Sequence, residues 1–283
     1  MPLNLPEGKN LAVNIGPDFD AHAVWMGTFD RTSPSYLSRG EFGAEVGVPR
    51  ILALLERYRI KATFCTPTHT MVTFPERFRS IVDAGHEIAA HGCYHESVPS
   101  LDKAEERRLM EVTIALHEKH VGARPRGYRS PAWDFTELTP TLLDEFGFDW
   151  DSSLMGRDFQ PYHPRPVVAL DRERGNTFGE PAKFLELPVS WYLDDFPPTE
   201  YVPGANPGYT PIDSLLKQWI DQFDYAYANE PNGVLCLTVH PQCIGRGHHI
   251  VALENFIKHV TGHPGAWIAT LSEIYDTWTE DPA

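Results

Sequence analysis

Three short segments, far apart along the chain, carry side chains that could together build a hydrolytic metal site. Asp18 and Asp20 follow the first apolar run, and His91 and His95 follow another run in the first third of the sequence. His240 ends an apolar run near the C-terminus. One carboxylate and two imidazoles can hold a divalent metal ion with coordination positions left open. The other carboxylate and imidazole would remain for proton transfer, so the set has the groups needed to split an amide bond with water.

Each segment also has an ordinary structural explanation. Asp18 and Asp20 would face the same side if strand geometry continues, but such a pair often forms a polar turn. His91 and His95 have the spacing of two ligands on one helical turn, but such pairs are more often structural or exposed. His240 would, as the alternative, be a core histidine with a satisfied hydrogen bond. The combination favours a site, because independent accidents would not supply complementary groups at several strand ends.

Two further segments carry groups that could support this chemistry. Arg129 lies at another strand end, where a buried guanidinium could orient a carboxylate and tune its pKa; a surface salt bridge is the alternative. Trp191, Tyr192, Asp194 and Asp195 follow a further apolar stretch. This aromatic and acidic cluster could line a pocket, or it could simply be packed at a bend of the chain.

The elements that must position these groups alternate between short apolar runs and helical patterns. Helices are expected around residues 51–58, from Pro75 to near Gly85, and from Asp102 to His120. Strands in such an alternation favour a parallel sheet or a barrel. The expected strands are residues 11–15, 61–66, 87–91, 127–130, 148–152, 184–189, 234–239 and 266–269.

The chain shows no internal repeat or clear linker, so we expect one domain over residues 1–283. Residues 156–183 fit neither pattern and are rich in Pro, Arg and Asp, which predicts a long surface excursion that could form a rim of the site. Residues 194–210 are similar, with several prolines and aromatic side chains.

Composition excludes several classes of protein. The net charge of −15 argues against binding nucleic acid or an anionic membrane surface. No apolar stretch approaches the ~18 residues of a membrane span, and the N-terminal residues 1–7 lack the basic and apolar regions of a secretory signal. The four cysteines lie apart without a Cys-x-x-Cys motif, and the first three, Cys65, Cys93 and Cys236, sit in or near apolar strands, which favours buried free thiols for these three. We therefore expect a cytoplasmic protein.

The order of these motifs resembles the polysaccharide deacetylase family, which is carbohydrate esterase family 4 or the nodulation-factor deacetylase homology domain. The resemblance covers the chain from about Asp18 to His240. Residues 38–43, 47–52, 187–191 and 240–246 look closest to the cytoplasmic branch of peptidoglycan-deacetylase-like proteins, cyclic imide hydrolases and metal-independent allantoinases.

The resemblance implies an α/β fold, namely a distorted (β/α) barrel of about seven strands. It also implies that Asp18 is the catalytic base. Asp20, His91 and His95 would be the metal ligands, with Zn²⁺ the expected cofactor and another divalent metal the alternative. The intact ligand set disfavours a metal-independent allantoinase.

The later motifs of the family match further positions. Arg129 matches the arginine of the third motif, and the backbone amide of Ala132 would help to bind the oxyanion. His240 matches the histidine that acts as general acid, with Asp194 or Asp195 as the residue that orients it; the sequence leaves this choice open.

Two departures from the family bear on the substrate. Pro17 stands before Asp18, where a strand residue is usual, and Ala132-Trp133 replaces a usual Tyr-Gly that lines the pocket. The bulky Trp133, Trp191 and Tyr192 could close a small pocket.

We therefore expect a metal-dependent hydrolase of non-peptide carbon–nitrogen bonds that acts on a small amide or cyclic imide. An N-acetyl sugar or peptidoglycan deacetylase is the alternative enzyme, and a non-catalytic binding protein on the same fold is the alternative from another class. A homo-oligomer is also expected.

Overall fold

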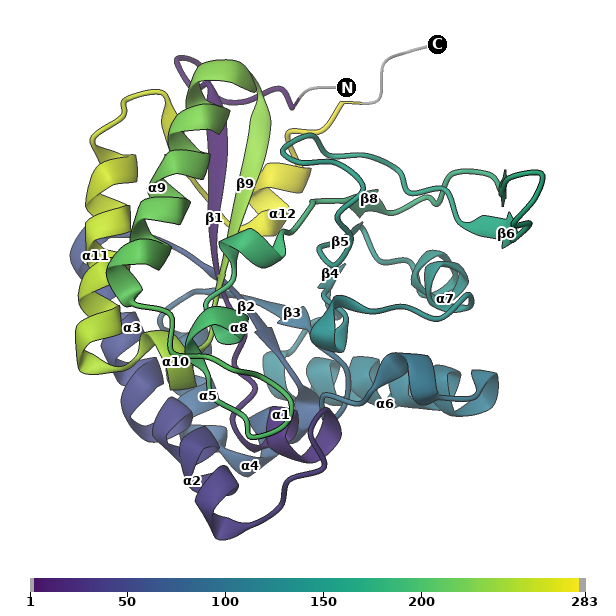
Figure 1. Ribbon diagram of the computed structural model, residues 1–283, viewed down its shortest axis with the longest axis horizontal. Helices are drawn as coiled ribbons and strands as arrows, with labels where there is room; N and C mark the ends of the chain where they lie inside the picture. The colour runs from purple at the N-terminus through teal and green to yellow at the C-terminus, as the bar shows by residue number, and fades with distance from the viewer. Residues whose placement is uncertain (1–2, 280–283) are drawn as a thin grey trace.

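A computed structural model describes residues 3–279 (Figure 1). Met1, Pro2 and residues 280–283, which the signal and domain predictions include, lie outside the described residues. Within the described part, two parallel sheets form the centre of the fold, with strand orders β10-β1-β9 and β2-β3-β4-β5-β8. Their bounds are β1 Leu11–Pro17, β2 Thr63–Thr66, β3 Glu87–Ala90, β4 Gly127–Tyr128, β5 Trp150–Asp151, β8 Leu185–Glu186, β9 Gly233–Val239 and β10 Ala266–Ile268.

Two isolated bridges join the sheets into a distorted barrel. Asp18 pairs in parallel with Cys65 beyond the end of β1, and Asp194 pairs in parallel with Thr238 on β9. β10 lies beside the first half of β1, so β1 and β2 pair only where their carboxyl ends meet. All eight predicted strands are present, most of them shorter than predicted, and the predicted (β/α) barrel is confirmed.

Helices cover the outside of the barrel, and Figure 1 shows α9 and α11 side by side over the sheet that contains β1 and β9. The helix predicted from Asp102 forms as α6, because the Asp102 side chain accepts hydrogen bonds from the amides of Ala104 and Glu105. The bounds are α1 His22–Gly27, α2 Pro34–Phe42, a π-helix Gly43–Gly47, α3 Val48–Tyr58, α4 Thr68–Thr73, α5 Pro75–Asp83, α6 Lys103–Val121, α7 Thr139–Phe146, α8 Phe196–Thr199, α9 Ile212–Asn229, α10 Pro241–Ile244, α11 Gly247–Thr261 and α12 Leu271–Tyr275.

The alternation of side chains along β1 and β9 sets which groups reach the barrel interior. On β1 the odd-numbered apolar residues Leu11, Val13 and Ile15 pack toward the helices, in the same cluster as the side chains of α9 and α11. The even-numbered Ala12 packs in a separate interior cluster. Because strand side chains alternate, this register carries Asp18 to the interior side at the end of the strand.

The excursion over residues 156–183 is a correction to the sequence analysis. It holds a small antiparallel hairpin, β6 Val167–Ala169 with β7 Thr177–Phe178, which extends away from the barrel (Figure 1). None of its residues lines the cavity described below, so this segment does not form a rim of the site. No helix among residues 3–279 is long and apolar enough to cross a membrane.

Candidate active site

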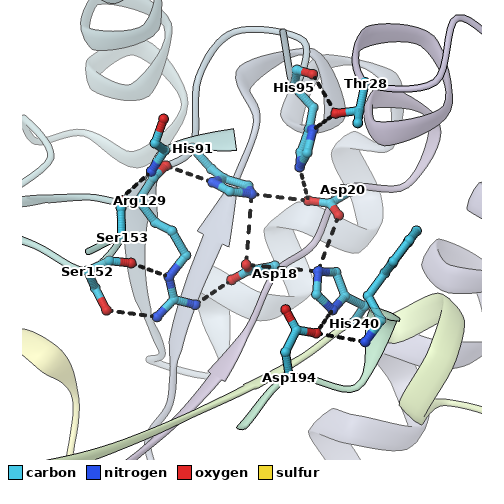
Figure 2. Close-up of polar contacts among 12 residues, drawn as sticks. Asp18, Asp20, Thr28, His91, His95, Arg129, Ser152, Ser153, Asp194 and His240 are labelled. Carbon is cyan, nitrogen blue, oxygen red and sulfur yellow. Dashed lines mark hydrogen bonds and ion pairs between the residues drawn. The ribbon is translucent and has the colours of Figure 1, made fainter. Parts of the chain in front are cut away.

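The predicted metal ligands meet at the carboxyl ends of the strands, as Figure 2 shows. Oδ1 of Asp20 lies 3.5 Å from Nε2 of His91 and 3.8 Å from Nε2 of His95. All three side chains are buried, and one ligand atom of each lies within 4.8 Å of the other two. Asp20 comes from the segment after β1 and both histidines come from the segment after β3, so two strands supply the set.

The hydrogen bonds around these side chains fit a metal ion. Nδ1 of His91 donates to the backbone oxygen of Arg129 over 2.7 Å, and Nδ1 of His95 lies 2.6 Å from the Thr28 hydroxyl. Each bond turns Nε2 of the same ring toward Asp20. Both carboxylate oxygens of Asp20 and Nε2 of His91 are buried and have no hydrogen-bond partner among residues 3–279. Buried groups of this kind need a partner, and a cation between them would supply one.

The protonation states of two ligands also suit metal binding. Burial would raise the pKa of Asp20, but the nearby imidazoles of His95 and His91 lower that pKa to about 2. Burial lowers the pKa of His95 to about 4. At neutral pH an ionised carboxylate therefore faces a neutral imidazole, and these are the forms that bind metals.

The segment that carries both histidines is a loop, which corrects the prediction of one helical turn. His91 leaves β3 directly, and His95 has a positive φ of 60°. The loop is held by Glu96, whose carboxylate accepts hydrogen bonds from the amides of Cys93 and Tyr94 over 2.9–3.0 Å. Gly92 has a φ of 66° and lies against Pro131, so a side chain there would clash. The two imidazoles meet through loop geometry and not through helical spacing.

Helix α1 supports this loop at its last residue. A Cβ atom on Gly27 would lie 2.2 Å from the backbone oxygen of His95 and 2.3 Å from that of Tyr94.

We expect Gly27→Ala to lower the free energy of unfolding by roughly 1–3 kcal/mol, because the backbone of the loop must move. The same change should weaken metal binding. Denaturant unfolding and metal titration measure both effects. Gly247→Ala is the matched control, because its Cβ would meet open space; equal stability of the two variants would contradict the prediction.

The predicted base lies next to the ligand set and is held by a buried arginine. Oδ1 of Asp18 accepts a hydrogen bond of 2.7 Å from Arg129, whose side chain is fully buried. Arg129 also donates to the backbone oxygen and the hydroxyl of Ser152, each over 3.0 Å. The other carboxylate oxygen of Asp18 lies 3.9 Å from Nε2 of His91 and 4.0 Å from Nε2 of His240. One oxygen is therefore anchored and the other faces the site.

The predicted acid approaches the ligand set from β9. Nε2 of His240 lies 3.7 Å from Oδ2 of Asp20. On the other side of the ring, Nδ1 lies 2.8 Å from Oδ1 of Asp195 and 3.5 Å from Oδ1 of Asp194. Asp195 also accepts from the backbone amide of His240, whereas Asp194 accepts from the amide of Phe196. The geometry therefore favours Asp195 as the residue that orients His240.

The charges around His240 favour the imidazolium. Burial lowers the pKa of His240, but the carboxylates of Asp194 and Asp195 outweigh burial and raise that pKa to about 10. Burial in turn raises the pKa of Asp194 to about 7. A protonated ring whose Nε2 faces the site is the form that a proton donor requires.

A cavity of about 230 Å³ opens over these groups. Trp133 and Trp191 stack along one wall with ring centroids 4.2 Å apart, and Ala132, with a φ of 52°, brings its backbone to the same wall. Tyr192 is 69% exposed and does not line the cavity, which corrects its predicted part in closing the pocket.

Several lining residues were missed by the sequence analysis. Thr28 and Phe29 follow α1, where no motif marks them. Phe196, Pro197 and Asn206 come from residues 194–210, whose prolines and aromatic side chains were the only signal. The residues from 194–210 reach the cavity together because this loop folds back on itself: the Asn206 amide donates to the backbone oxygens of Pro197 and Glu200.

A parallel barrel with a potential metal-ligand triad and with acidic and basic groups at the carboxyl ends of its strands defines a class of hydrolytic enzyme. The family model described as polysaccharide deacetylase matches residues 20–150. A peptidoglycan deacetylase of Helicobacter pylori is 35% identical over 281 residues, covering 95% of this chain and 96% of the relative. A peptidoglycan deacetylase-like protein of Gibberella zeae is 33% identical and covers 91% of this chain and 83% of the relative.

Solved structures agree with this result. A Mycobacterium smegmatis structure, provisionally assigned as a polysaccharide deacetylase, superposes with a TM-score of 0.84 at 35% identity over 97% of this chain and 92% of that one. An allantoinase structure superposes with a TM-score of 0.81 at 24% identity over 98% and 93%, which shows a shared fold. The chain belongs to the polysaccharide deacetylase family, and its predicted resemblance is confirmed.

Proposed function

We propose that the protein is a metal-dependent hydrolase that splits a non-peptide carbon–nitrogen bond of a small amide or cyclic imide. The observation that carries the proposal is the placement of Asp18 and His240 beside a ligand set in which both oxygens of Asp20 and Nε2 of His91 have no hydrogen-bond partner within residues 3–279. A binding protein without catalytic activity would need neither the anchored carboxylate nor the charged imidazole. Membership of a deacetylase family supports the same class of reaction.

Asp20, His91 and His95 would hold the metal. Two nitrogens and one oxygen suit Zn²⁺, which favours this mixed set in sites with open positions. When bound, the metal would polarise a carbonyl group and lower the pKa of a coordinated water.

The remaining groups would move protons and stabilise charge. Asp18 would remove a proton from the attacking water with the oxygen that faces the site, while Arg129 holds the other oxygen. The backbone amide of Ala132 would donate to the oxygen on which negative charge develops. His240, held by Asp195, would protonate the departing nitrogen.

The size and lining of the cavity support a small substrate. Its volume of about 230 Å³ lies below the ~300–1,000 Å³ of most ligand pockets, and two stacked pairs of aromatic side chains line it. Trp133, from the Ala132-Trp133 pair that replaces the usual Tyr-Gly, stacks on Trp191, and Phe29 stacks on Phe196 at 5.9 Å. Apolar surfaces of this kind would suit a single ring with an amide group.

Deacetylation of an N-acetyl sugar or of peptidoglycan is the second candidate. The 35% identity to the Helicobacter pylori peptidoglycan deacetylase, over nearly the whole of both chains, favours it. Hydrolysis rates for cyclic imides, ureides, N-acetylglucosamine oligomers and peptidoglycan, with zinc content measured in parallel, would separate the candidates. Turnover of the oligomers with none of any imide or ureide would reverse the order, and zinc binding without any turnover would favour a binding protein.

The tryptophan wall gives a prediction with a neighbouring control. Trp191→Ala should lower kcat/KM for the small substrate by about tenfold or more, since it removes apolar contact with the ligand and the stacking partner of Trp133. Metal affinity should stay unchanged. Tyr192→Ala removes an adjacent aromatic side chain outside the cavity and should leave kcat/KM unaltered. Steady-state kinetics on both variants tests this, and equal losses would contradict the assigned wall.

A further inference from the structure

A second group of potential metal ligands lies outside the barrel, between two helices that cover β1 and β9. Asp224 belongs to α9, His259 to α11, and His263 follows two residues after α11 ends. One ligand atom of each residue lies within 4.8 Å of the other two. We propose that these three side chains bind a divalent transition metal ion, such as Zn²⁺, that is separate from the ion of the candidate active site.

The hydrogen bond of His263 is arranged as in metal sites, and His259 already faces a carboxylate. Nδ1 of His263 donates to the backbone oxygen of His259 over 2.8 Å, which leaves the lone pair of its Nε2 available. A metal-binding histidine almost always has its other nitrogen hydrogen-bonded in this way. Nε2 of His259 lies 2.6 Å from Oδ1 of Asp224, so a nitrogen and a carboxylate oxygen from different helices already face each other.

The imidazole rings are held in place by aromatic packing. Phe223 is fully buried and meets the rings of His259 and His263 edge-on, with centroids 5.5 and 5.1 Å away. Tyr227 packs against His263 at 4.9 Å. The two imidazole centroids lie 4.8 Å apart. Because the rings are fixed before a metal arrives, little ordering would accompany binding.

Accessibility and charge favour a cation at this place. The side chains of His259 and Asp224 are 29% and 50% exposed, so an ion can reach them from solvent and water can complete its coordination. The chain carries a net charge of −15, which raises the local concentration of cations. Metal binding replaces the proton that Nε2 of His259 shares with Asp224: the proton passes to water, and the lone pair that it leaves on the nitrogen binds the metal. Imidazoles with one carboxylate suit Zn²⁺, Co²⁺, Ni²⁺ and Cu²⁺ better than Mg²⁺ or Ca²⁺.

The ion would clip α9 to α11, whose ligands lie 35 residues apart in the sequence. An ion that binds only the folded chain stabilises it by mass action. The melting temperature should therefore rise with metal concentration beyond the point at which the active site is saturated.

The test is Zn²⁺ and Co²⁺ titration of the untagged full chain by calorimetry, with melting curves at each metal concentration. We expect two ions per chain. His259→Gln and Asp224→Asn should each remove one ion and the later rise in melting temperature, without a change in activity. The controls are His248→Gln, which removes an exposed imidazole, and Asp221→Asn, which removes a charge one turn earlier on α9; both should keep two ions.

The result that would overturn the proposal is one ion per chain that is lost in His91→Ala but kept in His259→Gln, and this result would leave the proposed function intact. One ion lost in His259→Gln but kept in His91→Ala would instead overturn the candidate active site. Two bound ions per chain in both the His259→Gln and the Asp224→Asn variant would also overturn the proposed metal site between α9 and α11.

Discussion

Asp18→Asn should lower kcat by roughly 10²–10⁴-fold, which is the usual contribution of a general base, while the protein keeps its active-site metal. Asparagine has nearly the shape of aspartate and can still contact Arg129 through its carbonyl oxygen, but it cannot take a proton from water. Oδ2 of Asp18 lies 3.9 Å or more from the nitrogens of His91 and His240, so its loss removes no short contact of the ligand set. Single-turnover kinetics and zinc analysis on the same preparation measure both quantities.

Asp20→Asn is the matched comparison, since it changes the same group two residues later. It should lose both metal and activity. Neither oxygen of Asp20 has a hydrogen-bond partner among the described residues, so the ion would be the partner of both. If Asp18→Asn releases the metal and Asp20→Asn keeps it, the two roles have been exchanged. If Asp18→Asn keeps full activity, the base lies elsewhere in the cavity.

The ends of β1 and β9 could be predicted from the sequence because both strands are nearly continuous apolar runs, and both are buried along their whole length. The end of such a run marks the end of the strand, so the sequence predicts that Asp18, Asp20 and His240 lie at strand ends. The meeting of these ends at one edge follows from parallel pairing in a barrel. The sequence carries this signal because an apolar run is a local property of the chain.

The parts that were not predicted depend on contacts between distant segments. The His91–His95 spacing suggested a helix, but Gly92 at positive φ and the bonds from Glu96 make a loop instead. Asp194 and Asp195 are adjacent, and only the direction of each side chain relative to His240 separates them. The hydroxyl that positions His95 comes from a residue after α1 whose place is set by packing, so nothing in its local sequence marks it.

His91→Ala should remove the active-site metal and reduce hydrolysis to the background rate. The variant loses one of the three ligands, the imidazole whose Nε2 lies 3.5 Å from Oδ1 of Asp20. The fold should survive, because the lost hydrogen bond to the Arg129 carbonyl costs about 1–3 kcal/mol against a typical total stability of ~5–15 kcal/mol. Circular dichroism melting curves and zinc analysis would record these outcomes.

The surface ligands complicate this measurement, because an ion bound at His259 would remain in His91→Ala and could be mistaken for the active-site metal. The informative comparison is therefore made in a His259→Gln background, where one ion per chain should fall to none when His91 is also replaced. A folded double variant that still holds one ion would show that Asp20 and His95 do not need His91, and the ligand assignment would be wrong. Loss of both the ion and hydrolysis would tie activity to Asp20, His91 and His95, because His259 and Asp224 contact none of the described residues that line the cavity.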